Sequence, residues 1–209
     1  MSSAPASATN AAESPSRGRP REFDVEDALE KAVQVFCERG FHATSIGDLT
    51  EATQLTSGSL YKAFKDKRGL YLAAMTHYKD SRDAVLRAAI APARTGRERV
   101  RAALAHYAEA SHGERGRLGC MLINSATELA TFDDELGRWL AASLRRNETL
   151  LAALIREGLA DGSIPPQVDP AVTARLLLCL IQGMRVVGKT GMTRKDTLAL
   201  VDAALKTLA

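Results

Sequence analysis

The chain has 209 residues, of which 45% are hydrophobic and 25% are charged, and its formal net charge at pH 7 is +3. This composition is typical of a soluble globular protein with a core of its own. The three cysteines are odd in number and widely spaced, which excludes a disulfide framework and the ligand spacing of a zinc site. The small net charge does not indicate nucleic acid, so such a partner has to be inferred from where the basic residues lie.

Targeting and membrane segments are not expected in this sequence. The N-terminus lacks the apolar core of a signal peptide. The longest unbroken run of aliphatic residues and cysteine extends from Leu176 to Ile181. That run is far shorter than the roughly 20 residues that a membrane-spanning helix needs. We therefore expect a cytoplasmic protein that does not enter a membrane.

Residues 1–16 consist largely of Ser, Ala, Asn, Thr and Pro. Such a segment cannot bury enough apolar surface to offset the entropy of ordering, so we expect a disordered tail. Three arginines follow it, Arg17, Arg19 and Arg21. They are either a solvated basic tail or an arm that inserts arginine into an A·T-rich minor groove of DNA. We favour the arm because of the segment described next.

The first predicted helix begins at Asp24, a residue type that caps helix N-termini. Apolar residues then recur at helical spacing, and Gly40 is suited to end the helix. The expected core stripe consists of Val25, Leu29, Val33 and Phe36. Cys37 lies next to that stripe, and we interpret it as a packing residue.

Residues 45–64 have the pattern of two short helices joined by a tight turn. Each helix has one apolar face at helical spacing, and Thr44 or Ser45 is placed to cap the first. The apolar positions are Ile46, Leu49 and Ala52 in the first helix and Leu60 and Phe64 in the second. Helices this short are unstable alone in water, so the second one must dock on a body that presents it.

The second short helix is unusually rich in hydrogen-bond donors. Its expected outward residues are Thr56, Ser57, Ser59, Tyr61, Lys62 and Lys65. A short, presented helix of this kind suits the major groove of DNA, where its N-terminal end meets phosphates and base edges. The free N–H groups and the dipole at that end also favour phosphate. Tyr61 and Lys62 are expected to matter most.

From Pro20 to about Leu72, the sequence resembles the DNA-binding domain of the tetracycline-repressor (TetR) family. The matching residues are Gly18-Arg19-Pro20-Arg21, Ala32-Val33, Phe36, Gly40-Phe41, Thr44-Ser45-Ile46, Gly58-Ser59-Leu60-Tyr61, Phe64, Lys67 and Leu70. The resemblance implies an all-helical homodimeric transcription regulator, usually a repressor that a small ligand releases from a palindromic operator. It also implies that Lys67 and the capping hydroxyl reach DNA phosphate. The departure is Gln54, where members commonly have Gly; a side chain at positive φ there costs up to about 1 kcal/mol.

The candidate DNA-binding residues combine the arm, the cap and the second short helix. They are Arg17, Arg19, Arg21, Thr44, Ser45, Thr56, Ser57, Gly58, Ser59, Tyr61, Lys62, Lys65 and Lys67. We place the DNA-binding domain at residues 17–68 and a helical ligand-binding and dimerisation domain at residues 69–209. A long helix capped by Asp66 and ending near Ile90 starts in the first domain and enters the second, so it is the expected lever between them.

The remainder of the chain is also predicted to be helical, giving an all-α fold with about nine helices. Further helices are expected over residues 97–111, 120–130, 133–160, 170–189 and 193–208, with a basic loop over 113–119. The last two helices carry surplus apolar surface, including a stripe of Leu198, Val201, Leu205 and Leu208. Such a surplus predicts a two-fold interface between two copies of the chain. That dimer would place two DNA-reading helices about 34–36 Å apart. The alternative is a monomer that buries the apolar surface internally.

Polar residues among the apolar C-terminal helices are candidates for an effector cavity. They are His106, Tyr107, Cys120, Met121, Asn124, Glu128, Trp139, Gln182 and Arg185. The alternative is that residues such as Asn124 and Glu128 cap and cross-link helices. Cys120 is also a candidate redox or electrophile sensor, because it follows two arginines and begins a helix. An inert buried thiol is the simpler interpretation.

Three other classes of function are weighed against DNA binding. His106 and His112 lie six residues apart and therefore off a common helix face, so no metal site is expected. Phosphate-loop, nucleophile-elbow and paired-carboxylate signatures are missing, which argues against an enzyme, and no cofactor is expected. A helical scaffold that binds only protein would not need the basic arm or the donor-rich helix.

Overall fold

The computed structural model describes residues 23–130 and 133–209. These residues form an all-helical fold, as predicted, with ten α-helices and two short 3-10 helices. The α-helices are α1 (Val25–Ala43), α2 (Ile46–Thr53), α3 (Ser57–Phe64), α4 (Lys67–Ile90), α5 (Gly96–Glu109), α6 (Gly113–Leu118), α7 (Met121–Glu128), α8 (Asp134–Ala160), α9 (Pro170–Val187) and α10 (Arg194–Ala204). The 3-10 helices are η1 (Gly188–Thr190) and η2 (Leu205–Leu208). The helix that sequence analysis missed is α6, which was expected to be a loop.

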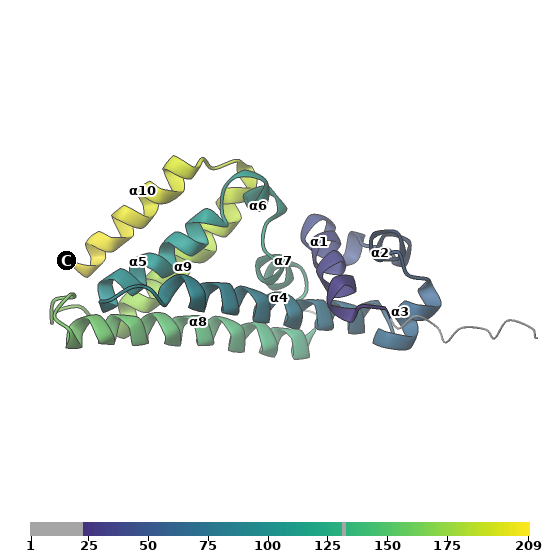
Figure 1. Ribbon diagram of the computed structural model, residues 1–209, viewed down its shortest axis with the longest axis horizontal. Helices are drawn as coiled ribbons and strands as arrows, with labels where there is room; N and C mark the ends of the chain where they lie inside the picture. Colours follow the sequence, from purple (N-terminus) through teal and green to yellow (C-terminus); the bar gives the residue numbers. More distant parts are fainter. Residues whose placement is uncertain (1–22, 131–132) are drawn as a thin grey trace, which may run out of the picture.

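The N-terminal helices α1, α2 and α3 gather around the start of α4, at one end of the molecule (Figure 1). Asp24 caps α1 as predicted, because its Oδ1 accepts a hydrogen bond from Glu26 N at 2.9 Å. The core that these helices enclose is apolar. In it, the ring of Phe36 packs edge-on against the ring of Tyr71, with 4.7 Å between ring centroids. Cys37 is buried in the same core, as the sequence indicated.

Helix α4 belongs to both halves of the molecule. Its N-cap is Asp66, whose Oδ1 accepts a hydrogen bond from Gly69 N at 2.7 Å, and the helix ends at Ile90 as predicted. Leu70 and Met75 pack in the N-terminal core, whereas Leu86 and Ile90 pack in the C-terminal one. The two cores are thus joined by one continuous helix.

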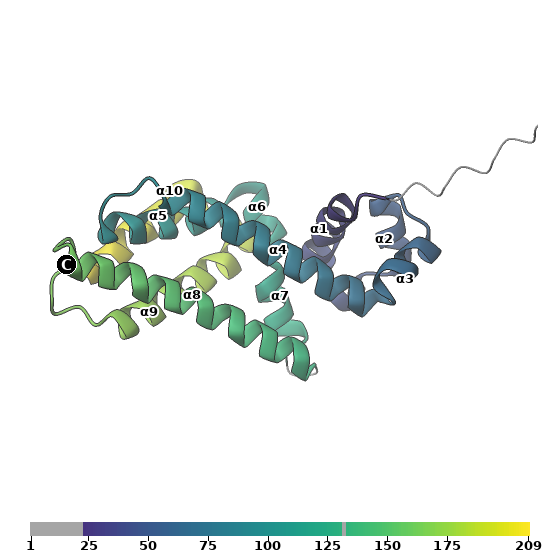
Figure 2. The ribbon, with the colours of Figure 1, turned by 60° about the horizontal axis from the view of Figure 1, so that its bottom comes forward.

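The C-terminal half consists of α5, α8, α9 and α10 around the far part of α4. In Figure 1, α8 lies below α4, and the turned view of Figure 2 shows the two helices running in roughly the same direction. Helices α5 and α8 approach very closely where Gly96 meets Gly158, since a Cβ added to Gly96 would lie 2.0 Å from Gly158 N. Helix α7 fills the space between the two halves, beside α1 (Figure 2).

The last two helices differ from each other in what they bury. The predicted stripe on α10 and η2 is used inside the protomer, because Val201, Leu205 and Leu208 are buried and α10 packs on α5. The expectation that both helices carry surplus apolar surface is therefore wrong for α10. On α9 the surplus is real: Val172 is 64% exposed and Leu176 is 52% exposed, while Leu177 and Ile181 face the core.

Helix α9 ends two residues before the predicted end, and it is more apolar over its whole length than the short run from Leu176 to Ile181 suggested. By length and composition alone, Pro170–Thr190 would pass as a membrane-spanning helix, with a mean hydropathy of 1.5. Its core-facing side packs against α8 and α5, so its apolar character has an explanation within the fold.

Candidate DNA-binding surface and effector cavity

The first short helix, α2, is anchored by a reciprocal cap at Ser45. Ser45 Oγ accepts a hydrogen bond from Asp48 N at 3.1 Å, and Ser45 N donates to the Asp48 carboxylate at 2.8 Å. These hydrogen bonds, together with the nearby Arg39 guanidinium, hold the pKa of Asp48 below its usual value. Ser45 remains exposed at the start of α2, so its contact with phosphate stays a prediction.

The turn between α2 and α3 contains the residue that departs from the family pattern. Gln54 has φ 58° and ψ 28°, the left-handed conformation that favours glycine. Its side chain donates from Nε2 to the carbonyl of Glu51 at 2.6 Å, which partly offsets the backbone strain. The positive φ considered from the sequence is therefore present.

Helix α3 presents its donors to solvent. Thr56 caps the helix by accepting from Ser59 N at 3.2 Å, and the two side-chain hydroxyls lie 3.0 Å apart. Leu60 holds the helix in the core with 2% exposure, whereas Tyr61 is 45% exposed. The exposed residues from the predicted set are Thr56, Ser57, Gly58, Tyr61, Lys62 and Lys65, with Ser59 half-buried. Their contacts with DNA remain predictions.

Two other predicted DNA contacts are engaged inside the domain. Thr44 is 1% exposed and its hydroxyl donates to the carbonyl of Gly40 at 2.6 Å, so its side chain is engaged within the domain and its contact with phosphate stays a prediction. Lys67 Nζ donates to the carbonyls of Phe41 and Thr44, both at 2.9 Å, and lies 4.3 Å from the centre of the Phe41 ring. One of its three donors is left for a phosphate. The predicted arm, Arg17, Arg19 and Arg21, lies outside the described residues.

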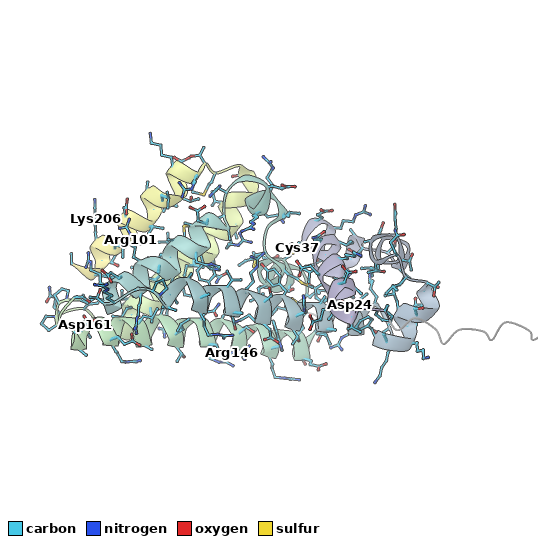
Figure 3. All side chains as sticks on the ribbon, in the orientation of Figure 1. Asp24, Cys37, Arg101, Arg146, Asp161 and Lys206 are labelled. Atoms are coloured by element: carbon cyan, nitrogen blue, oxygen red, sulfur yellow. The ribbon has the colours of Figure 1, made fainter. Side chains whose placement is uncertain are left out.

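Helix α7 is hydrogen-bonded to a break in α1, and we call this contact the α7 bracket. Gly40 interrupts α1 with φ 75° and ψ 179°, which frees the backbone groups on either side. Asn124 Nδ2 donates to the carbonyl of Cys37 at 3.1 Å. The carboxylate of Glu128 accepts from Phe41 N at 3.1 Å and from His42 N at 2.7 Å. Figure 3 labels Cys37 on the side of α1 that faces α7.

The α7 bracket corrects the assignment of Asn124 and Glu128 to the effector cavity. Both residues cross-link helices, which was the alternative interpretation, because the break in α1 leaves backbone groups without helical partners and side chains of α7 bond to three of them. The Gly40–Phe41 break in the sequence was the available signal, but it does not say which helix supplies the partners.

A second link joins α4 to the start of α8. Arg68 Nε donates to Asp133 Oδ2 at 2.8 Å, and Arg68 Nη2 donates to Glu135 at 2.8 Å. The hydrogen bond from Arg68 is the main reason that the pKa of Asp133 falls from 3.8 to about 2. This role of Arg68 was not predicted from the sequence, since its partners lie 65 and 67 positions away.

A cavity of about 50 Å³ lies among α4, α5 and α9, next to the start of α7. It is lined by Tyr78, Lys79, Arg82, Asp83, His106, Tyr107, Ala110, Cys120, Leu122, Asn147, Gln182 and Arg185. The predicted residues His106, Tyr107, Cys120, Gln182 and Arg185 are thus brought together. Met121 and Trp139 are not among the lining residues, because both pack in the N-terminal core. The lining residues of α4 were not foreseen.

Polar contacts surround the cavity. The hydroxyl of Tyr78 donates to Cys120 Sγ at 3.5 Å, so the thiol sits in the cavity wall and is half-buried. Burial raises the pKa of the Tyr107 hydroxyl to about 12, and it also lowers the pKa of His106, with help from Arg82 and Arg185. Both shifts favour the uncharged form of the side chain. Within residues 23–130 and 133–209, no cluster of three metal-ligating side chains occurs.

Comparisons with known proteins agree with this architecture. The model of "Bacterial regulatory proteins, tetR family" matches residues 28–74, and that of "Tetracyclin repressor-like, C-terminal domain" matches residues 96–197. The HTH-type transcriptional repressor ComR of Escherichia coli (strain K12) is 32% identical over 195 residues, which cover 91% of each chain. The uncharacterized HTH-type transcriptional regulator YezE of Bacillus subtilis (strain 168) is 30% identical over 131 residues, 63% of this chain and 68% of YezE.

Solved structures give the same result. A cysteine-substituted form of the TetR family transcriptional regulator CifR, complexed with 26-bp double-strand operator DNA, superposes with a TM-score of 0.81 and 30% identity. The alignment covers 90% of this chain and 98% of CifR. The exposed α3, the all-helical body and both family models therefore lead to one conclusion: this chain belongs to the TetR family and is a DNA-binding transcriptional regulator.

Proposed function

We propose that the protein is a ligand-responsive homodimeric repressor, which binds a palindromic operator through α3 and is released by a small molecule in the cavity. The single observation that carries the proposal is that an exposed, donor-rich α3 and a polar cavity are joined by one continuous helix, α4. ComR is named as a repressor and CifR is bound to operator DNA, which supports the DNA half of the proposal. We place the protein in the cytoplasm and assign it no catalytic activity.

The second copy is proposed to bind the exposed face of α9. Val172, Leu176 and Val186 lie at helical spacing on that face, and each is about half-exposed or more in the protomer. An apolar stripe of this kind is rarely left in water on a stable monomer. A two-fold axis through it would place two copies of α3 at the spacing of successive major grooves, about 34–36 Å.

Two connections carry the response from the cavity to α3. The first is α4, as expected from the sequence: Tyr78 and Arg82 line the cavity, and the start of the same helix packs against α3. The second is the α7 bracket. Cys120 lines the cavity directly before α7, and the same helix holds the break in α1 through Glu128. A ligand that moves either helix changes the spacing of the two α3 helices, with a coupling of about 1–3 kcal/mol.

A mobility-shift experiment with the DNA upstream of its own gene tests the DNA half. The expected result is a sequence-specific complex whose affinity falls steeply with salt. A helical enzyme or a scaffold that binds only protein would give no such complex. Titration of a ligand against the complex tests the other half, because a bound ligand that left operator affinity untouched would contradict the release mechanism.

A thiol sensor is the second candidate, on the same scaffold. The supporting observation is that Cys120 lines the cavity and accepts a hydrogen bond from Tyr78, whereas Cys37 is buried in the core. Burial raises the pKa of Cys37 to about 12, which makes it a poor nucleophile. In this candidate, an alkylating reagent releases the operator from the wild type and from Cys179→Ser, but not from Cys120→Ser. Equal release from all three would exclude the sensor.

A further inference from the structure

The cavity contains a buried positive charge that has no ion-pair partner among the residues that the structure describes. Arg185 is 5% exposed and projects from α9. Its Nη2 donates to the carbonyl of Gly119, but its Nη1 has no hydrogen-bond partner among the described residues. A buried guanidinium normally has a carboxylate partner and satisfies all its donors, because an unpaired buried charge is strongly destabilising. Arg185 therefore points to a missing acceptor.

The other lining residues do not supply that acceptor. Asp83 is the one carboxylate among the residues that line the cavity, and Lys79 already holds it in an ion pair. Arg82 adds a further positive charge, so three cationic side chains face one carboxylate. The lowered pKa of His106, caused first by burial and then by Arg82 and Arg185, is consistent with an electropositive interior.

The neutral groups around Arg185 are suited to a carboxylate. Gln182 lies one helical turn before Arg185, and the hydroxyls of Tyr78 and Tyr107 line the same space. Leu122 and Ala110 add apolar surface on which a short hydrocarbon chain can pack. The cavity volume of about 50 Å³ leaves room for only a few heavy atoms.

We propose that the cavity binds a small organic monoanion, a carboxylate with a short apolar chain, whose oxygens accept hydrogen bonds from Arg185. This inference rests on the proposed function, since it names the chemical class of the effector in that same cavity. Guanidinium and carboxylate form paired, charge-assisted hydrogen bonds, which are stronger than the neutral ones that an amide forms. Inorganic phosphate also pairs with guanidinium, but it has no hydrocarbon chain to pack on Leu122 and Ala110.

Arg185 also offers a route from such a ligand to the DNA-binding domain. Its guanidinium holds the carbonyl of Gly119, which directly precedes Cys120 and α7. An anion that draws the guanidinium toward the cavity loosens or shifts that contact at the start of α7. The other end of α7 holds the break in α1 through Glu128, so the displacement reaches the helix-turn-helix.

The test measures thermal stabilisation and calorimetric binding of the full chain with matched probes at constant ionic strength. The probes are propionate with propionamide, butyrate with butyramide, and inorganic phosphate. We expect saturable stabilisation by the carboxylates, because a ligand that binds only the folded state raises the melting temperature. The amides and phosphate should bind at least about tenfold more weakly.

Variants locate the binding. Arg185→Met keeps an unbranched apolar stem and removes the charge, and it should weaken carboxylate binding at least about tenfold. Arg185→Lys should retain part of the affinity, because the charge stays while the paired geometry is lost. The control is Arg101→Met. Arg101 pairs with Asp202 and does not line the cavity (Figure 3), so this variant should bind the probes as the wild type does.

The comparison of carboxylate with amide uses the wild type alone, so it decides the proposal even where Arg185→Met does not fold. Equal binding of amides, preferential binding of phosphate, or the lack of saturable carboxylate binding would each overturn the anion assignment. An operator complex that is unaffected by a bound carboxylate would instead contradict the release mechanism under the proposed function and leave the anion site standing. The two failures are therefore distinguishable.

Discussion

The two halves of the molecule use their polar groups in opposite ways. The N-terminal half keeps a closed apolar core and places the hydroxyl and ammonium groups of α3 in water. The C-terminal half encloses Lys79 and Arg185 beside its cavity, with 5% exposure for each residue. Exposed donors are free to meet a large, highly charged surface such as DNA, while enclosed donors are accessible only to a ligand of a few atoms. Substitutions should therefore affect affinity alone on α3, but stability and coupling together in the interior.

The largest loss of operator affinity is expected from a substitution on the exposed face of α9, the proposed dimer interface. Leu176→Glu places a charge in the middle of the α9 face, and two copies would bring like charges together across a two-fold axis. The variant should be monomeric by light scattering and should lose operator affinity at least about a hundredfold, because two linked α3 helices gain effective concentration. The control is Val85→Glu, at an equally exposed valine of α4. A Leu176→Glu protein that stays dimeric would exclude this face.

The α7 bracket tests the expectation that an interior substitution affects stability and operator binding together. Glu128→Ala leaves Phe41 N and His42 N without their acceptor, so the free energy of unfolding should fall by about 1–3 kcal/mol. Operator affinity should change as well, since the break in α1 is no longer held. Chemical denaturation and the mobility shift measure the two effects. Glu114→Ala, at an exposed position of α6, should change neither. Unaltered stability in Glu128→Ala would show that water replaces the carboxylate at no cost.

Substitution on α3 should change operator affinity and leave the stability of the fold unchanged. Lys62→Ala should reduce the dependence of log affinity on log salt by about one unit, because one phosphate contact is lost. The melting temperature should stay unchanged, since Lys62 is exposed and makes no described contact that stabilises the fold. Lys206→Ala, at the C-terminal end of the molecule in Figure 3, is the matched control. An unaltered salt slope in Lys62→Ala would remove the residue from the DNA contact.

A smaller effect is expected at the link between α4 and α8. The pKa of Asp133 is 3.8 in the reference state and about 2 in the fold, so this pair stabilises the protein above about pH 4. The contribution is lost as the pH falls through the folded pKa, because the carboxyl group becomes protonated. Asp133→Asn should lower the melting temperature only slightly at pH 7, because 43% of the Arg68 side chain is exposed and solvent screens the pair. The difference from the wild type should vanish toward pH 2, and a constant difference would contradict the assignment.

The smallest effect is expected in the turn before α3. Gln54→Gly removes the strain at φ 58° but also the hydrogen bond to Glu51, so the net stabilisation should be below about 1 kcal/mol. Chemical denaturation measures it, with Gln167→Gly in an exposed loop as the comparison. A clear loss of stability would mean that the side-chain hydrogen bond outweighs the strain.

Local signals account for what could be predicted from the sequence. Asp24, Ser45 and Asp66 cap helices at the expected places, because capping depends on neighbours within a few residues. Tertiary contacts account for the failures. Helix α6 was taken for a loop on account of its glycines, yet Gly116 is required by packing: a Cβ there would lie 2.7 Å from the carbonyl oxygen of Ser111.

Tertiary contacts also limited what could be predicted about the cavity. The polar pattern of the C-terminal helices indicated buried polar groups, but it could not assign each one a partner. Glu128 bonds to backbone groups 86 and 87 positions away, and its neighbour Asn124 does likewise. Tyr78 and Arg82 line the cavity because α4 packs against α5. The residue pattern within α4 does not reveal that packing.

The sharing of α4 by both cores has a consequence for how the protein melts. A helix that is common to two hydrophobic cores cannot fray in one without exposing apolar surface in the other. Heating or denaturant should therefore give one cooperative transition for the whole protomer, and a fragment that stops before Leu86 should not retain a stable fold.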